Sequence, residues 1–181
     1  TDDDPGESQT PLVAIGASTG GPQALAEVLN GMQRPLSCAV LIVQHLDQQF
    51  VPGLAEWLAT ETGLPVQVAG NYQPLPPGHV QVACSADHLT VNPSGFILYV
   101  REPSNHVYRP SVDVLFQSLL KVRNRRRVAV LLTGMGRDGA LGMKALRQAG
   151  WTTIAQDQAT SIVWGMPGEA VRLGAAAQIL P

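Results

Sequence analysis

Short apolar runs that resemble buried strands alternate with amphipathic runs that resemble helices along most of this chain. The first strand-like run is Leu12–Ile15 and the first helix-like run is Pro22–Leu29, and Ala39–Val43 and Val51–Thr60 repeat the pair. A strand followed by a helix and another strand is typical of a parallel βαβ unit. The pattern therefore predicts a three-layer α/β/α fold, doubly wound, around a mainly parallel sheet.

The middle of the chain departs from this alternation. The runs Val80–Cys84, His88–Val91 and Phe96–Arg101 alternate like strands with no helix between them, and a turn-forming Asn-Pro-Ser-Gly follows Val91. We expect an antiparallel hairpin here, as an insertion or at a sheet edge. The other expected elements are a strand at Val66–Ala69, a helix at Ser111–Val122, a strand at Val128–Leu132, a helix at Ala140–Gln148, a strand at Thr152–Ala155 and a helix near Met166–Leu173.

The length of 181 residues suits one domain with its own core. Residues 1–10 are polar and acidic, which predicts a linker or disordered lead-in, and residues 11–181 are expected to form the folded domain. A net charge of −2 with 14% charged residues disfavours nucleic acid as a partner. No apolar run approaches the roughly 20 residues that span a bilayer, so we expect no membrane insertion. Cys38 and Cys84 lack a paired-cysteine motif, which favours reduced thiols and a cytoplasmic location.

Three chemically active residue types follow the expected strands. Ser18 lies in the glycine-lined turn after Leu12–Ile15, His45 follows Ala39–Val43, and Asp138 follows Val128–Leu132. The carboxyl ends of parallel strands share one edge of the sheet, where ligands bind at the point at which the strand order reverses. Nucleophilic catalysis by serine needs a base and a carboxylate that orients it. The three residues together predict a catalytic triad.

Each assignment has a structural alternative. A serine in such a turn also caps helices or binds phosphate through backbone amides, although Gly-Ala-Ser-Thr-Gly fits the G-x-S-x-G pattern of an exposed nucleophile. His45 could also be a structural or solvated histidine at a strand end. His79, His88 and His106 are the other histidines, and none of them follows a strand.

Asp138 has its own competitors. Asp47 and Asp157 are other carboxylates near strand ends, and Asp138 could also be the N-cap of the helix Ala140–Gln148. The frame from Thr133 to Gly139 contains three glycines, which indicates backbone that closely approaches another group. This frame favours Asp138 for the triad.

Several distinctive motifs occur in order along the chain. They are Ile-Gly-Ala-Ser-Thr-Gly-Gly-Pro ending at Pro22, Ile-Val-Gln-His-Leu ending at Leu46, Pro-Gly-His-Val ending at Val80, Arg-Pro-Ser-Val-Asp-Val-Leu-Phe ending at Phe116, Leu-Thr-Gly-Met-Gly-Arg-Asp-Gly ending at Gly139, and Thr-Ile-Ala-Gln-Asp ending at Asp157, which is followed by Gly-Met-Pro ending at Pro167. Together these motifs resemble the catalytic domain of the chemotaxis protein-glutamate methylesterases, the CheB family, over essentially Leu12 to Pro181. The resemblance implies a serine hydrolase that removes methyl groups from glutamate γ-methyl esters of chemoreceptors, and members of the family can also deamidate glutamines.

Carried onto this sequence, the resemblance implies Ser18 as nucleophile, His45 as general base and Asp138 as the carboxylate that orients it. It also implies the backbone N–H near Met135 as an oxyanion donor and Thr19 as a second hydroxyl in the pocket. It implies no metal and no cofactor.

The implied partners are the cytoplasmic region of a methyl-accepting chemoreceptor and an N-terminal receiver domain, which this sequence does not contain. The basic stretch Lys121–Arg127 is either a docking site for an acidic partner or a solvated helix end. Two other functions remain open at this point. One is a non-catalytic nucleotide- or phosphate-binding module, and the other is a small-molecule esterase, because a triad does not name its substrate.

Overall fold

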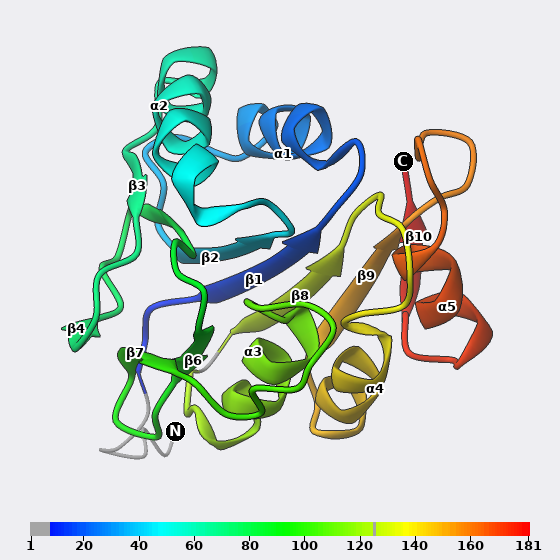
Figure 1. The fold of residues 1–181 in the computed structure, drawn as a ribbon. Coiled ribbons are helices and arrows are strands. Elements are labelled where there is room, and N and C mark those ends of the chain that lie inside the picture. Colours follow the sequence, from blue (N-terminus) through cyan, green and yellow to red (C-terminus); the bar gives the residue numbers. More distant parts are fainter. Residues whose placement is uncertain (1–7, 125) are drawn as a thin grey trace.

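A seven-stranded parallel sheet forms the centre of the molecule in the computed structural model, which describes residues 8–124 and 126–181. Its strand order is β10-β9-β8-β1-β2-β5-β3 (Figure 1). The strands are β1 (Leu12–Ala17), β2 (Ala39–Gln44), β3 (Val66–Val68), β5 (Val80–Val82), β8 (Arg127–Leu131), β9 (Thr152–Gln156) and β10 (Gln178–Leu180).

Helices cover the two faces of this sheet, and they confirm the predicted three-layer arrangement (Figure 1). On one face lie α1 (Gly21–Asn30) and α2 (Val51–Thr62), whereas α3 (Val112–Ser118), α4 (Ala140–Gln148) and α5 (Met166–Arg172) lie on the other. Two short 3₁₀ helices, Gln48–Phe50 and Leu119–Lys121, complete the helical elements of the described residues. Each face has its own apolar cluster, one containing Leu25 and Leu58 and the other Phe116 and Met143. Burial of these clusters is the main force that holds the layers together.

A small antiparallel sheet contains the predicted hairpin. It consists of β4 (Gln73–Pro74), β6 (His88–Val91) and β7 (Phe96–Val100), in the order β4-β7-β6. The side-chain Oδ1 of Asn92 accepts hydrogen bonds from the N–H groups of Ser94 and Phe96, which fixes the turn between β6 and β7. The hairpin prediction is therefore confirmed.

The placement of Val80–Cys84 with the antiparallel segment was wrong. Val80–Val82 is β5 of the main sheet and pairs in parallel with both β2 and β3. All three residues are buried, and even the polar Gln81 is only 1% exposed. The alternation of apolar and polar residues here does not reflect one face in water, which is why the pattern misled.

The strand order reverses at β1, and this position creates the crevice. β2 pairs with one side of β1 and β8 with the other, in registers that place Gln44 beside Ala17 and Leu131 beside Gly16. The loops after β1, β2 and β8 therefore leave the sheet side by side at one edge. An edge of this kind is where ligands bind in open α/β sheets.

The polar start of the chain lies partly outside the described residues, because the expected lead-in covers residues 1–10 and the description begins at residue 8. The N–H of Ser8 donates to the carbonyl of Arg123, and the side chain of Asn124 donates to the carbonyl of Thr10. These residues thus run alongside the segment that precedes β8. Among the helices described, none combines the length and hydropathy needed to cross a bilayer.

Candidate active site

Ser18 is fixed through its backbone by both neighbouring strands. It opens the turn between β1 and α1, and its N–H donates to the carbonyl of Thr133 at 3.0 Å. From the other side, Nε2 of Gln44 donates to the carbonyl of Ser18 at 2.8 Å. A Cβ at Gly134 would lie 2.7 Å from the Cβ of Ser18, so only glycine lets the loop after β8 approach this closely. The turn holds a half-buried serine at the edge of the sheet.

His45 and Asp138 are in direct contact. Nε2 of His45 lies 2.7 Å from Oδ2 of Asp138, and the two side chains are 8% and 1% exposed. Because an ionised carboxylate only accepts hydrogen bonds, this contact places a proton on Nε2 and leaves Nδ1 as the basic nitrogen of the neutral ring. Nδ1 is buried and has no hydrogen-bond partner. His45 therefore carries an oriented and unengaged base.

The third residue, Ser18, is brought beside His45 by the backbone. The N–H of His45 donates to the carbonyl of Ala17, the residue just before Ser18, at 3.0 Å. Within the described part of the chain, the Ser18 hydroxyl forms no hydrogen bond. A nucleophile and its base often come within bonding distance only when substrate binds. Ser18 and His45 thus follow adjacent strands, one with an unengaged hydroxyl and the other with an unengaged imidazole nitrogen.

Asp138 is held at the start of α3 by a full set of donors. Its Oδ2 accepts from the N–H of Val112 at 2.8 Å in addition to His45, and its Oδ1 accepts from the hydroxyl of Ser111 at 2.8 Å and the N–H of Asp113 at 3.0 Å. Burial raises the pKa of Asp138, but the hydrogen bonds from His45, Asp113 and Val112 outweigh it and hold the pKa below its ordinary value. The carboxylate stays ionised despite its burial.

The alternative role of Asp138 as the N-cap of α4 was wrong. The N-cap of α4 is Gly139, and no side chain caps that position. Asp113 serves α4 instead, since its Oδ1 accepts from the N–H of Gly142 at 2.8 Å. Burial raises the pKa of Asp113, and the neighbouring Asp138 carboxylate raises it further, against the lowering effect of the Gly142 bond. Asp138, which precedes α4, thus binds backbone N–H groups at the start of α3, and Asp113 in α3 binds one at the start of α4.

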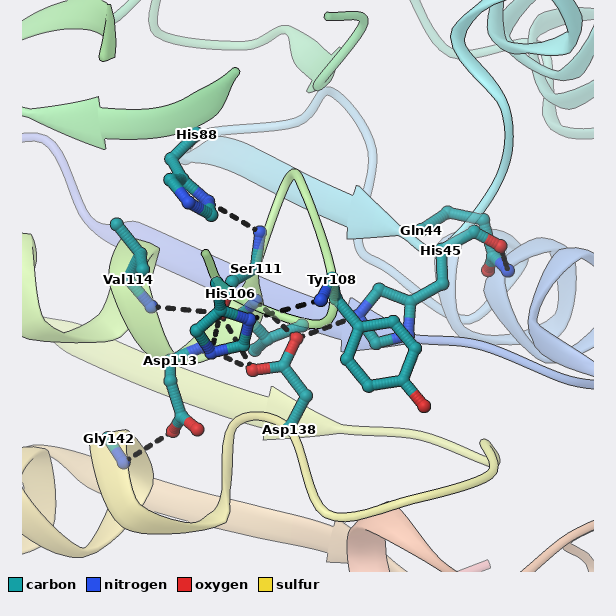
Figure 2. A network of polar contacts seen from close by, with 11 residues as sticks. Gln44, His45, His88, His106, Tyr108, Ser111, Asp113, Val114, Asp138 and Gly142 are labelled. Atoms are coloured by element: carbon teal, nitrogen blue, oxygen red, sulfur yellow. Dashed lines mark hydrogen bonds and ion pairs between the residues drawn. The ribbon is translucent and has the colours of Figure 1, made fainter. Parts of the chain in front are cut away.

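Ser111 and two histidines extend the network, and sequence reasoning missed their roles (Figure 2). Ser111 is the N-cap of α3, and its N–H donates to Nδ1 of the buried His88, whose Nε2 lies 2.9 Å from the carbonyl of Pro103. Nε2 of His106 lies 3.3 Å from the Ser111 hydroxyl. The Ser111–Asp113 sequence, a serine followed two residues later by an acid, was a usable helix-start signal. Nothing local indicated which carboxylate it would bind.

Tyr108 covers the His45 imidazole and was also missed. The two rings are stacked with their centroids 4.0 Å apart and their planes within 1° of parallel (Figure 2). A Cβ at Gly136, whose φ is +86°, would lie 2.8 Å from the Tyr108 hydroxyl. The tyrosine therefore reaches from the base to the loop that follows β8.

The predicted oxyanion donor lies on that same loop. Among the described residues, none accepts a hydrogen bond from the Met135 N–H, and the Met135 side chain is 60% exposed. An unpaired backbone N–H next to the Ser18 turn is the kind of donor that stabilises a developing oxyanion. Thr19, the expected second hydroxyl, is exposed, and its carbonyl accepts from the Thr133 hydroxyl.

A group of possible metal ligands lies beneath the site. His106, Asp113 and Asp138 place donor atoms within 4.8 Å of one another. These donors are already engaged, since Asp138 accepts four hydrogen bonds, Asp113 accepts from Gly142, and Nδ1 of His106 accepts from the N–H of Tyr108. Hydrogen bonding accounts for the cluster without a cation.

The family model described as CheB methylesterase matches residues 13–181. The chain belongs to the CheB methylesterase family. The CheB catalytic domain of Thermotoga maritima, a solved structure, superimposes with a TM-score of 0.90 at 30% sequence identity, over 96% of this chain and 94% of that one. The fold described above is therefore the CheB catalytic fold.

Curated CheB relatives are closer in sequence. A protein-glutamate methylesterase/protein-glutamine glutaminase of Burkholderia lata is 53% identical over 171 residues, which is 94% of this chain and 51% of that protein. One from Pseudomonas putida is 49% identical over 170 residues, again 94% of this chain and 50% of that protein. The chain spans about half the length of these relatives.

Proposed function

We propose that this chain is the catalytic part of a protein-glutamate methylesterase, acting in the cytoplasm on chemoreceptors in chemotactic adaptation. Ser18 is the nucleophile, His45 the general base and Asp138 the carboxylate that orients it. The observation that carries the proposal is the His45–Asp138 bond of 2.7 Å, which leaves Nδ1 unpaired on a residue whose N–H binds the carbonyl of Ala17, next to Ser18. The names of the curated relatives and the family of the chain support the substrate.

The first half-reaction forms an acyl-enzyme. His45 Nδ1 takes the Ser18 proton while Oγ attacks the γ-carbonyl of a glutamyl methyl ester, which gives a tetrahedral intermediate and an imidazolium. Asp138 stabilises that imidazolium through Nε2. The Met135 N–H and the positive end of α1 stabilise the oxyanion. The intermediate collapses, the C–O bond to the methoxy group breaks, and the imidazolium gives its proton to the leaving oxygen to release methanol.

The second half-reaction restores the enzyme. A water molecule gives a proton to His45 and attacks the acyl carbon, and a second tetrahedral intermediate expels Ser18, which regains its proton from the imidazolium. The product is a glutamate side chain. A glutamine side chain follows the same course with ammonia as the leaving group, which is the glutaminase reaction that the names of the relatives include.

The position of the half-buried Ser18 outside the flanking cavities favours a side chain presented on another protein. Two cavities flank the site, one of about 660 Å³ lined by residues that include Asp138 and Arg137, and one of about 390 Å³ lined by residues that include His45 and Arg109. Ser18 lines neither of them. Small-molecule esterases bury most of their ligand in a cavity that contains the nucleophile. A nucleophile beside the cavities suits a protruding glutamyl side chain.

The receiver domain that the resemblance implies is a second proposed partner, and it would regulate access to this edge of the sheet. A methanol-release assay with a separately added receiver domain, phosphorylated or not, tests this partner. Unchanged turnover in both forms would contradict it.

The decisive experiment is release of radiolabelled methanol from methylated receptor membranes by the wild-type chain and by Ser18→Ala. We expect release by the wild type and none above background by the variant, with both folded by circular dichroism. A panel of small esters and a set of nucleotides run alongside. Turnover of small esters without receptor demethylation would favour the small-molecule esterase. Nucleotide binding with no labelling of Ser18 by a fluorophosphonate would favour the binding module.

A further inference from the structure

We propose that Tyr108 is a positioning residue that holds the His45 imidazole in the orientation needed to take the Ser18 proton. The proposal rests on the roles proposed above for Ser18 and His45. Its basis is the parallel stack of the two rings, with centroids 4.0 Å apart and planes within 1° of parallel. Tyr108 acts through His45 and takes no part in the bond changes.

The His45 ring needs such a support. Its only side-chain hydrogen bond within the described residues is the one from Nε2 to Asp138, and Nδ1 has no partner. An imidazole bonded through one nitrogen can still tilt about that bond, which would swing Nδ1 away from the Ser18 hydroxyl. A flat ring on one face removes this freedom. The π face of tyrosine also attracts the positive imidazolium that forms during each proton transfer.

Tyr108 is itself anchored to the triad from the opposite end. Its N–H donates to Nδ1 of His106 at 3.1 Å, and Nε2 of His106 lies 3.3 Å from the Ser111 hydroxyl. That hydroxyl donates to Oδ1 of Asp138 at 2.8 Å. The contacts close a circuit from Asp138 through His45, Tyr108, His106 and Ser111 back to Asp138 (Figure 2). The stacked ring and the orienting carboxylate are thus set relative to each other.

Tyr108 is not placed for packing in the core. It is half-buried and belongs to neither apolar cluster, and together with Val107 it lines both of the cavities that flank the site. A half-buried side chain that lines two cavities contributes less to stability than one enclosed in a core. Its effect on function is therefore measurable in a folded variant.

The test compares three variants of the 181-residue chain. Tyr108→Phe keeps the aromatic face, and Tyr108→Leu replaces it with a smaller aliphatic side chain. Val107→Ala is the matched control, because Val107 is 87% exposed and lines the same two cavities. Two quantities are measured. One is kcat and KM for methanol release from methylated receptors, and the other is the rate at which a fluorophosphonate labels Ser18, which needs the serine and its base but not the receptor.

We expect Tyr108→Leu to lower kcat and the labelling rate by about tenfold, with KM within about twofold of the wild type. We expect Tyr108→Phe to recover most of that loss and Val107→Ala to label at the wild-type rate. Circular dichroism and the thermal midpoint check that each variant is folded. Tyr108→Gln replaces Tyr108→Leu if the latter unfolds at the assay temperature.

Three results would overturn the proposal. The first is an increase in KM at constant kcat, which would make Tyr108 a substrate contact. The second is a loss in Tyr108→Phe as large as in Tyr108→Leu, which would assign the effect to the hydroxyl. The third is an unchanged labelling rate in Tyr108→Leu. If the wild type labels at Ser18 but releases no methanol, the proposed substrate fails while the labelling rates still decide the role of Tyr108.

Discussion

Nε2 of His45 donates to Oδ2 of Asp138 across 2.7 Å, although 93 positions separate the two residues in sequence. This bond decides which nitrogen of the ring is available as a base. Because Nε2 donates its hydrogen bond to the carboxylate, Nδ1 is the nitrogen that can accept a proton. The activity should therefore depend on the acceptor character of residue 138 as much as on its presence.

Asp138→Asn tests this dependence. The asparagine amide group can donate to Nε2, which would move the imidazole proton to Nδ1 and remove the base. We expect kcat for methanol release to fall by about 10⁴-fold while circular dichroism shows an unchanged fold. A loss smaller than tenfold in the folded variant would argue against Asp138 as the orienting carboxylate.

Ser111→Ala should weaken both the helix and the site. The hydroxyl accepts from the N–H of Val114 as the N-cap of α3 and donates to Asp138. We expect the free energy of unfolding in urea to fall by about 1–2 kcal/mol, with a several-fold loss in kcat. Ser94→Ala, in the exposed turn of the hairpin, is the control and should change stability by less than about 0.5 kcal/mol. Equal effects of the two substitutions would remove Ser111 from the network.

Gly134→Ala should displace Ser18, the proposed nucleophile. The new Cβ would lie 2.5 Å from the Met166 sulfur and 2.7 Å from the Ser18 Cβ, so the turn and the loop must separate. A shift on the order of 1 Å at a reacting group costs about 10² in rate, and we expect that loss in kcat. The matched control is Gly53→Ala in α2, where nothing lies within 4 Å of the added carbon. It should keep full activity and gain up to about 1 kcal/mol in stability.

Stability should also fall in acid because of Asp138. Its pKa is held below the ordinary value in the folded state, so the stabilisation is present above the unfolded pKa of about 3.9 and is lost as the pH falls through the lower, folded pKa. We expect the wild type to exceed Asp138→Asn in unfolding free energy at pH 7 and the difference to shrink below pH 4. Asp113→Asn should show the opposite trend, since the Asp113 pKa is raised. If the wild type and Asp138→Asn differ in unfolding free energy by the same amount at pH 7 and pH 3, the lowered pKa of Asp138 is contradicted.

The sequence predicted the layers and the polar ends of three strands because those features are local. An apolar run next to a glycine turn makes Ser18 a candidate nucleophile, and strand ends make His45 and Asp138 candidate partners, with no knowledge of their contacts. The parallel pairing of Val80–Val82 was not predictable in this way. Its central Gln81 is buried, so a polar residue in the pattern suggested a solvent face that does not exist. The strand β10 was missed because three exposed residues carry no burial signal.

The residues that support the proposed triad could not be predicted from the sequence for a different reason. Tyr108 and His106 lie in the long connection between β7 and α3, where no hydrophobic period indicates direction. Their positions depend on where that connection crosses the sheet edge, which is a property of the whole fold. The role of Gln44 was not predictable from the sequence either. It is the final residue of a buried strand, and nothing local indicated that its amide would bind the Ser18 carbonyl.

The hydrogen bonds of Asp138 to the start of α3 and of Asp113 to the start of α4 make the proposed triad rigid. Asp138 cannot leave His45 without also releasing the first turn of α3, and Asp113 ties that same turn to the start of α4. A control element that worked by pulling the carboxylate away would have to unravel two helix starts at once. Obstructing the approach to Ser18 demands no such disruption. An inhibitor of this domain, natural or designed, should therefore cover Ser18 and leave the His45–Asp138 contact unchanged.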